Sequence, residues 1–449
     1  MIQETLLPRP PDLLPEEERR LQDQVKLRQL RQGGIWGRIV LFWLLLGPGL
    51  LVMIGDNDAG GVITYAATGA TYGLSLFIPF LILMIPVAYV VQEMTVRLGA
   101  VVQKGHAELI HERFGPFWGF FSLIDLLLGN LLTLVTEFVG MAAGLSILGI
   151  SLPLGVGISL GLLLFITLAG PYLAVERRIL AFALLNLVFV PLAFMAHPNW
   201  HRVAGTFYHP SLPGGLTSQV IFLLIANVGT TIAPWMLFYQ QGAVVDKGLT
   251  PTDIRHGRWD TFLGSVVMGT IAVAIVVLTG ATLYHSGISL ANYGSAQFAQ
   301  ALKPFLGIWG ERLFALGLFE AGFVAASTIS LSSAWAFGEI YRWPHSLNSR
   351  LKEAPGFYLI YSLGLIAAAA LVLIPQAPLE LISLTVQVLA TILMPPALIF
   401  LLLLLNDPEL MGSHRNGWLA NASTGTIIAG ILILTTVYAL LTLFPHWLA

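Results

Sequence analysis

Long apolar stretches separated by short polar connections dominate the chain. A stretch of about 20 apolar residues is long enough to cross a bilayer as a helix. Eleven such stretches can be placed, at residues 39–71, 75–96, 117–147, 152–170, 178–197, 218–245, 261–284, 312–340, 357–376, 380–405 and 421–444. The pattern therefore predicts an all-α membrane protein with eleven transmembrane helices.

The first stretch is interrupted by polar residues in its middle. The run Gly55-Asp56-Asn57-Asp58-Ala59-Gly60-Gly61 places two carboxylates and three glycines where hydrocarbon is expected. A charge at the bilayer centre costs at least about 2.5–3.5 kcal/mol, and unwound backbone is tolerated there only against protein or a water-filled cavity. We expect Gly60 to let the backbone unwind, and we interpret the interruption as a binding site.

The sixth stretch is interrupted in the same way, at Gly229-Thr230-Thr231-Ile232-Ala233-Pro234-Trp235. Two broken helices at corresponding positions of two halves indicate a transporter built from inverted repeats, with its site between the breaks. The predicted organisation is a tail (1–38), a first repeat of five helices (39–197), a second repeat (218–405) and an added eleventh helix (421–444). Carbonyls at the helix ends would help to bind a cation beside Asp58. The alternative is a pair of kinks that serve packing only.

Composition supports a membrane protein and narrows its chemistry. The chain is 56% hydrophobic and only 10% charged, and it contains no cysteine, so disulfides, thiolate metal sites and cysteine redox chemistry are excluded. Phosphate-binding glycine loops, nucleophile–base pairs and nucleic-acid patches are absent from the sequence. We therefore expect no enzyme activity, no bound cofactor and no nucleic-acid partner.

Basic residues predict the orientation. With the N-terminal tail inside, 19 Lys and Arg residues fall on the cytoplasmic side and three, Arg202, Lys303 and Arg312, on the other. This asymmetry predicts a cytoplasmic N-terminus and an external C-terminus. Near the cytoplasmic helix ends we expect Glu93 to pair with Arg97, and Glu339 with Arg342.

Several motifs resemble the Nramp family of divalent-metal transporters, which have the LeuT-type fold. The resemblance covers roughly residues 38–445 and rests on motifs in spans 1, 2, 3 and 5 and in the loop after span 2. These are Gly47-Pro48-Gly49, Asp58-Ala59-Gly60-Gly61, Thr64, Gly69-Ala70-Thr71-Tyr72-Gly73, Gln92-Glu93-Met94-Thr95-Val96-Arg97-Leu98-Gly99, Lys104-Gly105-His106-Ala107-Glu108-Leu109, Glu137-Phe138-Val139-Gly140 and Glu176-Arg177-Arg178. The resemblance implies the LeuT-type fold with five-plus-five inverted repeats and transport of a divalent metal.

The family's metal ligands are only partly kept. In the family that the sequence resembles, the metal ligands are an Asp and an Asn on helix 1 and a carbonyl and a Met sulfur on helix 6. A polar residue on helix 10 is often a further ligand. These positions fall at Asp58, Gly61, Thr230, Ala233 and Leu393, with Gln387 nearby on helix 10. The two helix-6 histidines fall at Trp235 and Gln240, and the helix-3 acid pair is reduced to Glu137 because Leu134 takes the Asp position.

These departures favour a hard cation. A thioether is a soft ligand, and Ala233 lacks it, whereas Mg²⁺ keeps several waters and is held by one or two carboxylates. The prokaryotic Nramp-related magnesium transporters also lack the helix-6 Met and histidines. We place the metal, Mg²⁺ or Mn²⁺, among Asp58, Thr230, Gly55, Ala233, Gly61, Asp56 and Asn57. Because His is the side chain that titrates near neutral pH, its loss predicts weak or absent proton coupling.

The roles of the remaining polar residues stay open. Asp56 either lines the access path, widens the acid cluster or caps the unwound backbone. Glu137 is either a relic of a proton route, a supporting residue or a neutral acid bonded to a neighbouring helix; Asp125 and Glu320 raise the same question. Trp235 either plugs the site or packs, and Gln387 and Gln240 are candidate supporting residues.

The predicted function is a secondary transporter that moves a divalent cation across a bacterial plasma membrane by alternating access, as a monomer in the lipid bilayer. Two alternatives remain. One is a cation-driven carrier of a small organic solute such as an amino acid, and the other is a channel-like metal pore.

Overall fold

The computed structural model describes residues 34, 46–168, 170–284, 286, 295–375 and 379–443. Within these ranges the chain is helical and has no strand. The predicted tail, apart from residue 34, and the start of the first predicted span at 39–45 lie outside the described residues.

Most helices coincide with the predicted stretches. They are α3 (Pro48–Asp56), α4 (Ala59–Tyr72), α5 (Phe77–Val102), α6 (His106–Phe114), α7 (Pro116–Ile147), α8 (Leu152–Leu168), α9 (Tyr172–Ala183), α10 (Phe189–Met195), α11 (Trp200–Gly205), α12 (Ser218–Gly229), α13 (Pro234–Asp246), α14 (Ile254–Thr282), α15 (Ser295–Tyr341), α16 (Pro355–Val372), α17 (Leu379–Asn406), α18 (Pro408–Met411) and α19 (Trp418–Leu443). Short 3₁₀ segments lie at η1 (Leu184–Val188), η2 (Pro251–Asp253) and η3 (Gly412–His414). Helices α6, α11 and α18 lie outside the predicted stretches, and α15 begins before residue 312 and is kinked at Gly307.

Nine helical segments of the described chain are long and apolar enough to cross a membrane. The first predicted span is present as the short pair α3 and α4, and the fourth as the 17-residue helix α8. The total of eleven spans and the repeat symmetry therefore stay predictions.

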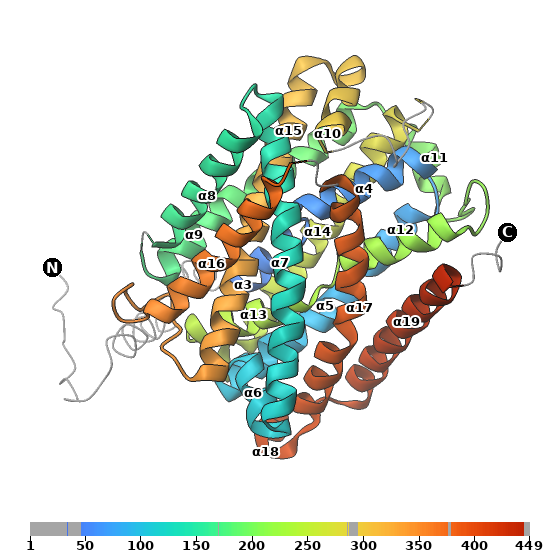
Figure 1. The fold of residues 1–449 in the computed structure, drawn as a ribbon. Helices are drawn as coiled ribbons and strands as arrows, with labels where there is room; N and C mark the ends of the chain where they lie inside the picture. The colour runs from blue at the N-terminus through green and yellow to red at the C-terminus, as the bar shows by residue number, and fades with distance from the viewer. Residues whose placement is uncertain are drawn as a thin grey trace.

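Burial separates an inner set of helices from a peripheral one (Figure 1). In the most apolar 18-residue part of Ser218–Asp246, which holds α12 and α13, 89% is buried within the protein. The corresponding part of α19 is only 6% buried, and α19 stands beside α17. Long α15 packs along α7, and α14 packs against α3, α4 and α5. The two predicted broken helices thus lie inside the bundle, and the predicted extra helix lies at its edge.

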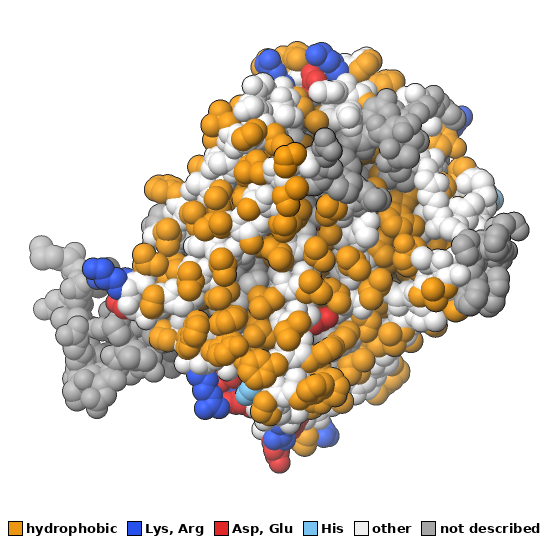
Figure 2. All heavy atoms as spheres, viewed as in Figure 1, with side chains coloured by type: hydrophobic (Ala, Val, Ile, Leu, Met, Phe, Trp, Pro, Cys, Tyr) orange, Lys and Arg blue, Asp and Glu red, His pale blue; other side chains and the backbone are white. Residues whose placement is uncertain are grey.

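The surface matches a bilayer environment. Figure 2 shows apolar side chains spread over the middle of one face, while most charged side chains gather towards its ends. Large exposed apolar residues include Phe165, Phe194 and Leu359. Exposed apolar area of this extent is stabilised by lipid rather than by water.

The fifth predicted span differs from a regular helix. It begins at Tyr172, earlier than residue 178, and the 3₁₀ segment η1 divides it into α9 and α10. The apolar pattern did not predict this interruption. Its physical cause is available in the sequence, because Pro191 has no N–H for the carbonyl of Leu187 and crowds it in a regular helix.

Candidate functional site

The first break is shorter than the sequence predicts. Only Asn57 and Asp58 lie between α3 and α4, so Gly55 and Asp56 still belong to α3, and Gly60 and Gly61 to α4. The expectation that Gly60 unwinds the backbone is therefore wrong. A Cβ at Gly60 would collide with the Gln387 side chain, so the glycine instead lets α17 approach α4.

Carboxylates from other helices cap both half-helices of the broken pair. Asp260 of α14 accepts hydrogen bonds from the backbone N–H groups of Gly47, Gly49 and Leu50, at 3.0, 2.7 and 3.1 Å. Glu137 of α7 accepts from the Ala59 N–H at 2.9 Å. These bonds satisfy orphan donors that a helix N-terminus otherwise leaves free, so the interrupted helix is stable at membrane depth.

Asp58 is the central group of the break. Its side chain is 3% exposed, and it accepts a hydrogen bond from the Gly61 N–H as the N-cap of α4. The Gln387 amide of α17 donates to both carboxylate oxygens, at 3.1 and 3.2 Å. Gln387 therefore holds the Asp58 carboxylate in place while leaving lone pairs for a further ligand.

The second break meets the first through Tyr65. Helix α12 ends at Gly229 and α13 begins at Pro234. The Tyr65 hydroxyl of α4 donates to the Thr230 carbonyl at 3.2 Å, while the Thr230 and Thr231 hydroxyls donate back to the Asn227 carbonyl. Asp58 and Tyr65 are seven residues apart and thus share a face of α4, a spacing that could have identified Tyr65 from sequence.

Gly61 lies closely packed between the two breaks. A Cβ at this position would lie 3.0 Å from Asp58 Oδ1, 3.4 Å from the Asp56 carbonyl and 3.5 Å from Thr230 Cβ. A longer side chain at position 61 would thus point into the space between Asp58 and Thr230.

Ala233 and Leu393, which take the positions of the family's helix-6 Met and helix-10 polar residue, are apolar and adjacent. Ala233 and Leu393 line one small cavity of about 10 Å³ between α7, α13 and α17, together with Trp235 and Thr133. The Ala233 N–H points at the Met236 sulfur, 3.4 Å away. That thioether therefore contacts the backbone of the break rather than replacing a sulfur at position 233.

Asp56 and Asn57 point in different directions. Asp56 is 2% exposed, and its Oδ2 has no hydrogen-bond partner within the described chain. Its charge lies within electrostatic range of Asp58 and Tyr65. The Asn57 amide instead donates to the Met268 carbonyl of α14 at 3.1 Å.

The remaining candidates are buried around the breaks. Trp235 packs on the side of Gly55, where a Cβ would lie 3.6 Å from the indole ring. Gln240 accepts from Thr95 at 2.8 Å and donates to Thr261 at 2.9 Å, which joins α5, α13 and α14. Gly55 lies in the last turn of α3, whose terminal carbonyls lack intrahelical donors.

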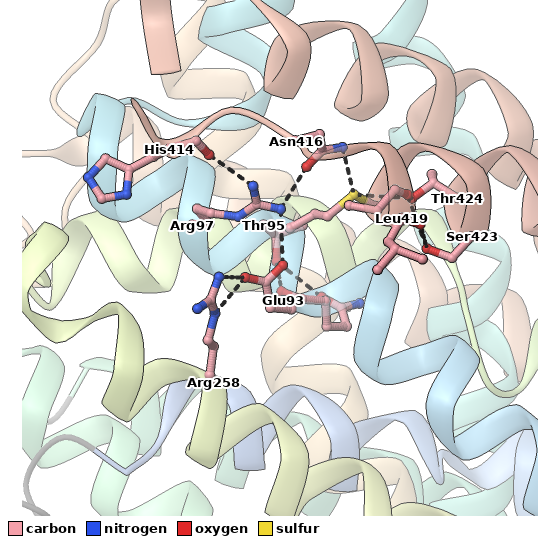
Figure 3. Close-up of polar contacts among 12 residues, drawn as sticks. Glu93, Thr95, Arg97, Arg258, His414, Asn416, Leu419, Ser423 and Thr424 are labelled. Atoms are coloured by element: carbon pink, nitrogen blue, oxygen red, sulfur yellow. Dashed lines mark hydrogen bonds and ion pairs between the residues drawn. The ribbon is translucent and has the colours of Figure 1, made fainter. Parts of the chain in front are cut away.

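A polar network closes the end of the bundle that we predict to be cytoplasmic (Figure 3). Glu93 accepts from Arg97 at 3.1 Å and from Arg258 at 2.8 Å, while Arg97 donates to the His414 carbonyl and to Asn416. The predicted Glu93–Arg97 pair is thus confirmed. Glu339 instead accepts from the N–H groups of Ala107 and Glu108, because the α6 N-terminus offers it free donors.

The chemistry available at the breaks is that of oxygen ligands. Within the described ranges, no group of three or more His, Cys, Asp or Glu side chains is arranged to hold a metal ion. An ion here would meet the Asp58 and Asp56 carboxylates together with neutral carbonyl and hydroxyl oxygens. Such a set suits a hard cation that keeps part of its water.

A membrane bundle in which two interrupted helices meet at a buried carboxylate is the architecture of secondary transporters. Within that class, the chain belongs to the natural resistance-associated macrophage protein-like family, Nramp, whose profile matches residues 49–442.

Individual relatives agree with this assignment. The divalent metal cation transporter MntH of Aeromonas hydrophila is 27% identical over 412 residues, covering 88% of this chain and 95% of the relative. A manganese transporter structure from Eremococcus coleocola superposes with a TM-score of 0.73 at 21% identity, covering 88% of this chain and 87% of that one. The fold is also similar to that of MhsT, solved with L-phenylalanine, with a TM-score of 0.56 at 13% identity over 88% of this chain and 97% of that one.

Proposed function

We propose that this protein is a secondary transporter of a divalent metal cation and that the cation binds at the meeting point of the two helix breaks. The observation that supports this most directly is Asp58, a buried carboxylate held by Gln387 between two interrupted helices. A buried charge at such a position has a functional partner by default. The Nramp relatives named for divalent metal and manganese transport support the same cargo.

The ligand set favours Mg²⁺, with Mn²⁺ as the other candidate. In this proposal Asp58 and Asp56 supply carboxylates, and Thr230 and Gly55 supply carbonyls. Gly61 and Ala233 have no ligating side chain, so coordinated water would complete the shell. Mg²⁺ dehydrates reluctantly and uses few protein carboxylates, whereas the soft sulfur ligand that favours transition metals is absent at position 233. Asn57 contributes through its backbone, because its amide is bonded to α14.

Proton coupling is weak or absent in this proposal. Trp235, Gln240 and Leu134 cannot exchange protons, and Glu137 is bonded to the Ala59 N–H and to Thr136. Uptake in proteoliposomes that does not respond to an imposed proton gradient is the expected result. Acidification of the lumen driven by metal entry would contradict it.

Transport in proteoliposomes tests the function. We expect uptake of Mg²⁺ or Mn²⁺ in preference to Ca²⁺ by alternating access, with the N-terminus on the cytoplasmic side of the bacterial plasma membrane. The Asp58→Ala variant should lose this uptake. A carrier of organic solutes would instead accumulate an amino acid, and a channel-like pore would give single-channel currents; either result would replace the proposal.

A further inference from the structure

A groove lies between α5 and α14 on the outer surface of the bundle. Its walls include Pro86 and Tyr89 of α5 and Arg255, Arg258, Trp259 and Phe262 of α14, and its volume is about 450 Å³. Volumes of about 300–1,000 Å³ are usual for sites that bind small organic molecules. The transport site proposed above contains none of these residues, so the α5–α14 groove is a separate feature of the molecule.

Close helix contacts flank the α5–α14 groove. Gly257 and Gly269 of α14 are positions where an added Cβ would collide with side chains of α5. Between these two positions, the rings of Tyr89 and Phe262 meet edge to face with their centroids 5.8 Å apart. The shape of the groove is therefore set by the packing of two helices and not by a loop.

The side chains of α14 change from charged to apolar along the groove. Arg255 and Arg258 lie in the first two turns of α14, which begins at Ile254, and Trp259 and Phe262 follow at helical spacings of three or four residues. Trp259 is 51% exposed and Phe262 is 42% exposed, so both rings are open to the bilayer. Basic and then aromatic residues are found in this order where a helix leaves the cytoplasmic surface and enters hydrocarbon.

Positive charge at the start of α14 is only partly balanced. Glu93 of α5 pairs with both Arg97 and Arg258, at 3.1 and 2.8 Å (Figure 3). Arg255 is exposed and makes no hydrogen bond or ion pair with the part of the chain that the structure describes. Three guanidinium groups therefore accompany one carboxylate. Arg258 is half-exposed and has further N–H groups that Glu93 does not use.

We propose that the α5–α14 groove binds an anionic phospholipid of the cytoplasmic leaflet. Arg255 and Arg258 hold its phosphate, and Trp259, Phe262 and Pro86 contact an acyl chain. Guanidinium groups bind phosphate oxygens through paired, charge-assisted hydrogen bonds, and basic pockets between transmembrane helices on the cytoplasmic side suit acidic headgroups. An anionic headgroup balances the excess positive charge, whereas a zwitterionic lipid brings no net charge.

The bound lipid joins the polar network at the same end of the bundle. Arg258 connects the phosphate to Glu93, and Glu93 is connected through Arg97 to Asn416, just before α19. Lipid binding should therefore stabilise the packing of α5 against α14. This inference goes beyond the proposed function and does not depend on it, because lipid binding is measured directly and without a metal ion.

Quenching of Trp259 by brominated lipid tests the site. The full-length protein is placed in phosphatidylcholine nanodiscs with increasing fractions of phosphatidylglycerol that carries bromine on its acyl chains, which quenches a tryptophan on contact. Trp259 is one of 11 tryptophans, so its share is obtained by subtracting the signal of Trp259→Phe. We expect saturable quenching, with an apparent affinity at least about tenfold higher than for brominated phosphatidylcholine.

Variants identify the residues that hold the headgroup, each being compared with its own Trp259→Phe form. Arg255→Gln should weaken phosphatidylglycerol binding about fivefold, which is the contribution of one basic residue near an acidic lipid, and Arg258→Gln should weaken it in the same direction. Arg342→Gln is the control, because it removes an exposed arginine that lines a different cavity. Asp58→Ala should keep the lipid preference while losing metal uptake.

Three results would overturn the proposal. Equal quenching by brominated phosphatidylcholine and phosphatidylglycerol would show an unselective lipid shell. Wild-type lipid affinity in Arg255→Gln would show that the arginine does not bind the headgroup. Displacement of the brominated lipid by inorganic phosphate as effectively as by unbrominated phosphatidylglycerol would show a site for the free ion. The comparison of the two lipids needs only the wild type and Trp259→Phe, so it tests the site even if an arginine variant does not fold.

Discussion

At the scale of single residues, Asp58 combines two roles that are usually separate. It caps α4 by accepting from the Gly61 N–H, and it places its carboxylate at the first break, where the Gln387 amide donates to both oxygens. A carboxylate has about four lone-pair positions, so three hydrogen bonds leave room for an ion. Cation binding at this residue requires no rearrangement of its cap.

The sequence could identify Asp58 and Gln387, because a polar side chain in an apolar helix is conspicuous. It could not pair Glu137 with the Ala59 N–H, which are 78 positions apart in the chain. It also could not show that Asn57 turns its amide towards α14, because side-chain direction at a helix break depends on tertiary packing.

Ala233 provides a direct test of metal preference. We predict that Ala233→Met raises the affinity for Mn²⁺ relative to Mg²⁺ by about tenfold, because a thioether favours the softer ion. Competition between the two ions in binding or uptake measures this ratio. Ala233→Leu is the matched control, since it adds similar volume to the small cavity without sulfur. An equal change in both variants would show that volume, not the sulfur ligand, sets the preference.

At the scale of elements, the broken helices depend on groups from their neighbours. Asp260 of α14 caps α3, and Glu137 of α7 caps α4. The sequence indicated both breaks through their Gly, Pro and Asp residues. It overestimated the length of the first break, because glycines next to a break are also used for close helix packing. It missed the 3₁₀ interruption η1, although Pro191 removes the helix hydrogen bond to the carbonyl four residues earlier, that of Leu187 in η1.

Substitutions at Glu137 distinguish a capping role of this residue from a proton-carrying role. We predict that Glu137→Gln keeps both stability and metal uptake, because the amide oxygen still accepts the Ala59 N–H. Glu137→Ala should lose about 1–3 kcal/mol of stability, since that donor is left without a partner. Thermal unfolding and proteoliposome uptake of the two variants measure this. Loss of uptake in a stable Glu137→Gln protein would instead indicate a proton-carrying role.

Gly229 is where α12 approaches α17. A Cβ there would collide with the Gln387 carbonyl and would lie 2.7 Å from the Thr391 hydroxyl. We predict that Gly229→Ala destabilises the protein by about 1–3 kcal/mol, because the two helices must move apart. Gly161→Ala in α8 is the control, since a Cβ at Gly161 meets no atom within 4 Å. Equal melting temperatures for both variants would contradict this packing account.

At the scale of the whole molecule, the bundle places its polar chemistry inside and its apolar surface outside. The broken helices lie in the interior, and α19 lies at the edge. Apolar stretches of about 20 residues predicted most of the long helices and their positions in the chain, because each span must be apolar to enter a bilayer. Helices α7 and α15 pack along each other although they are far apart in the sequence. The apolar pattern along the chain cannot predict which helices become neighbours.

Stability should depend on pH through His106. This residue begins α6, contacts Phe238 of α13 and shares a hydrogen bond with Gln241, and burial lowers its pKa from 6.5 to about 4. The unfolded chain therefore binds this proton more tightly than the folded protein does. The contribution of neutral His106 to the free energy of unfolding is complete above about pH 6.5, and about 3 kcal/mol of it is lost as the pH falls towards 4. His106→Gln should lack this pH-dependent part in unfolding measurements. A variant with the same acid sensitivity as the wild type would contradict it.

The central claim is that Asp58 anchors a divalent cation between the two breaks. Calorimetric titration of Mg²⁺ and Mn²⁺ into purified protein tests it most directly, with Asp58→Asn as the variant because it keeps the size and cap of the side chain. We predict saturable binding to the wild type and at least about tenfold weaker binding to Asp58→Asn, because the charged ligand is removed. Binding of equal affinity to both proteins would contradict the account.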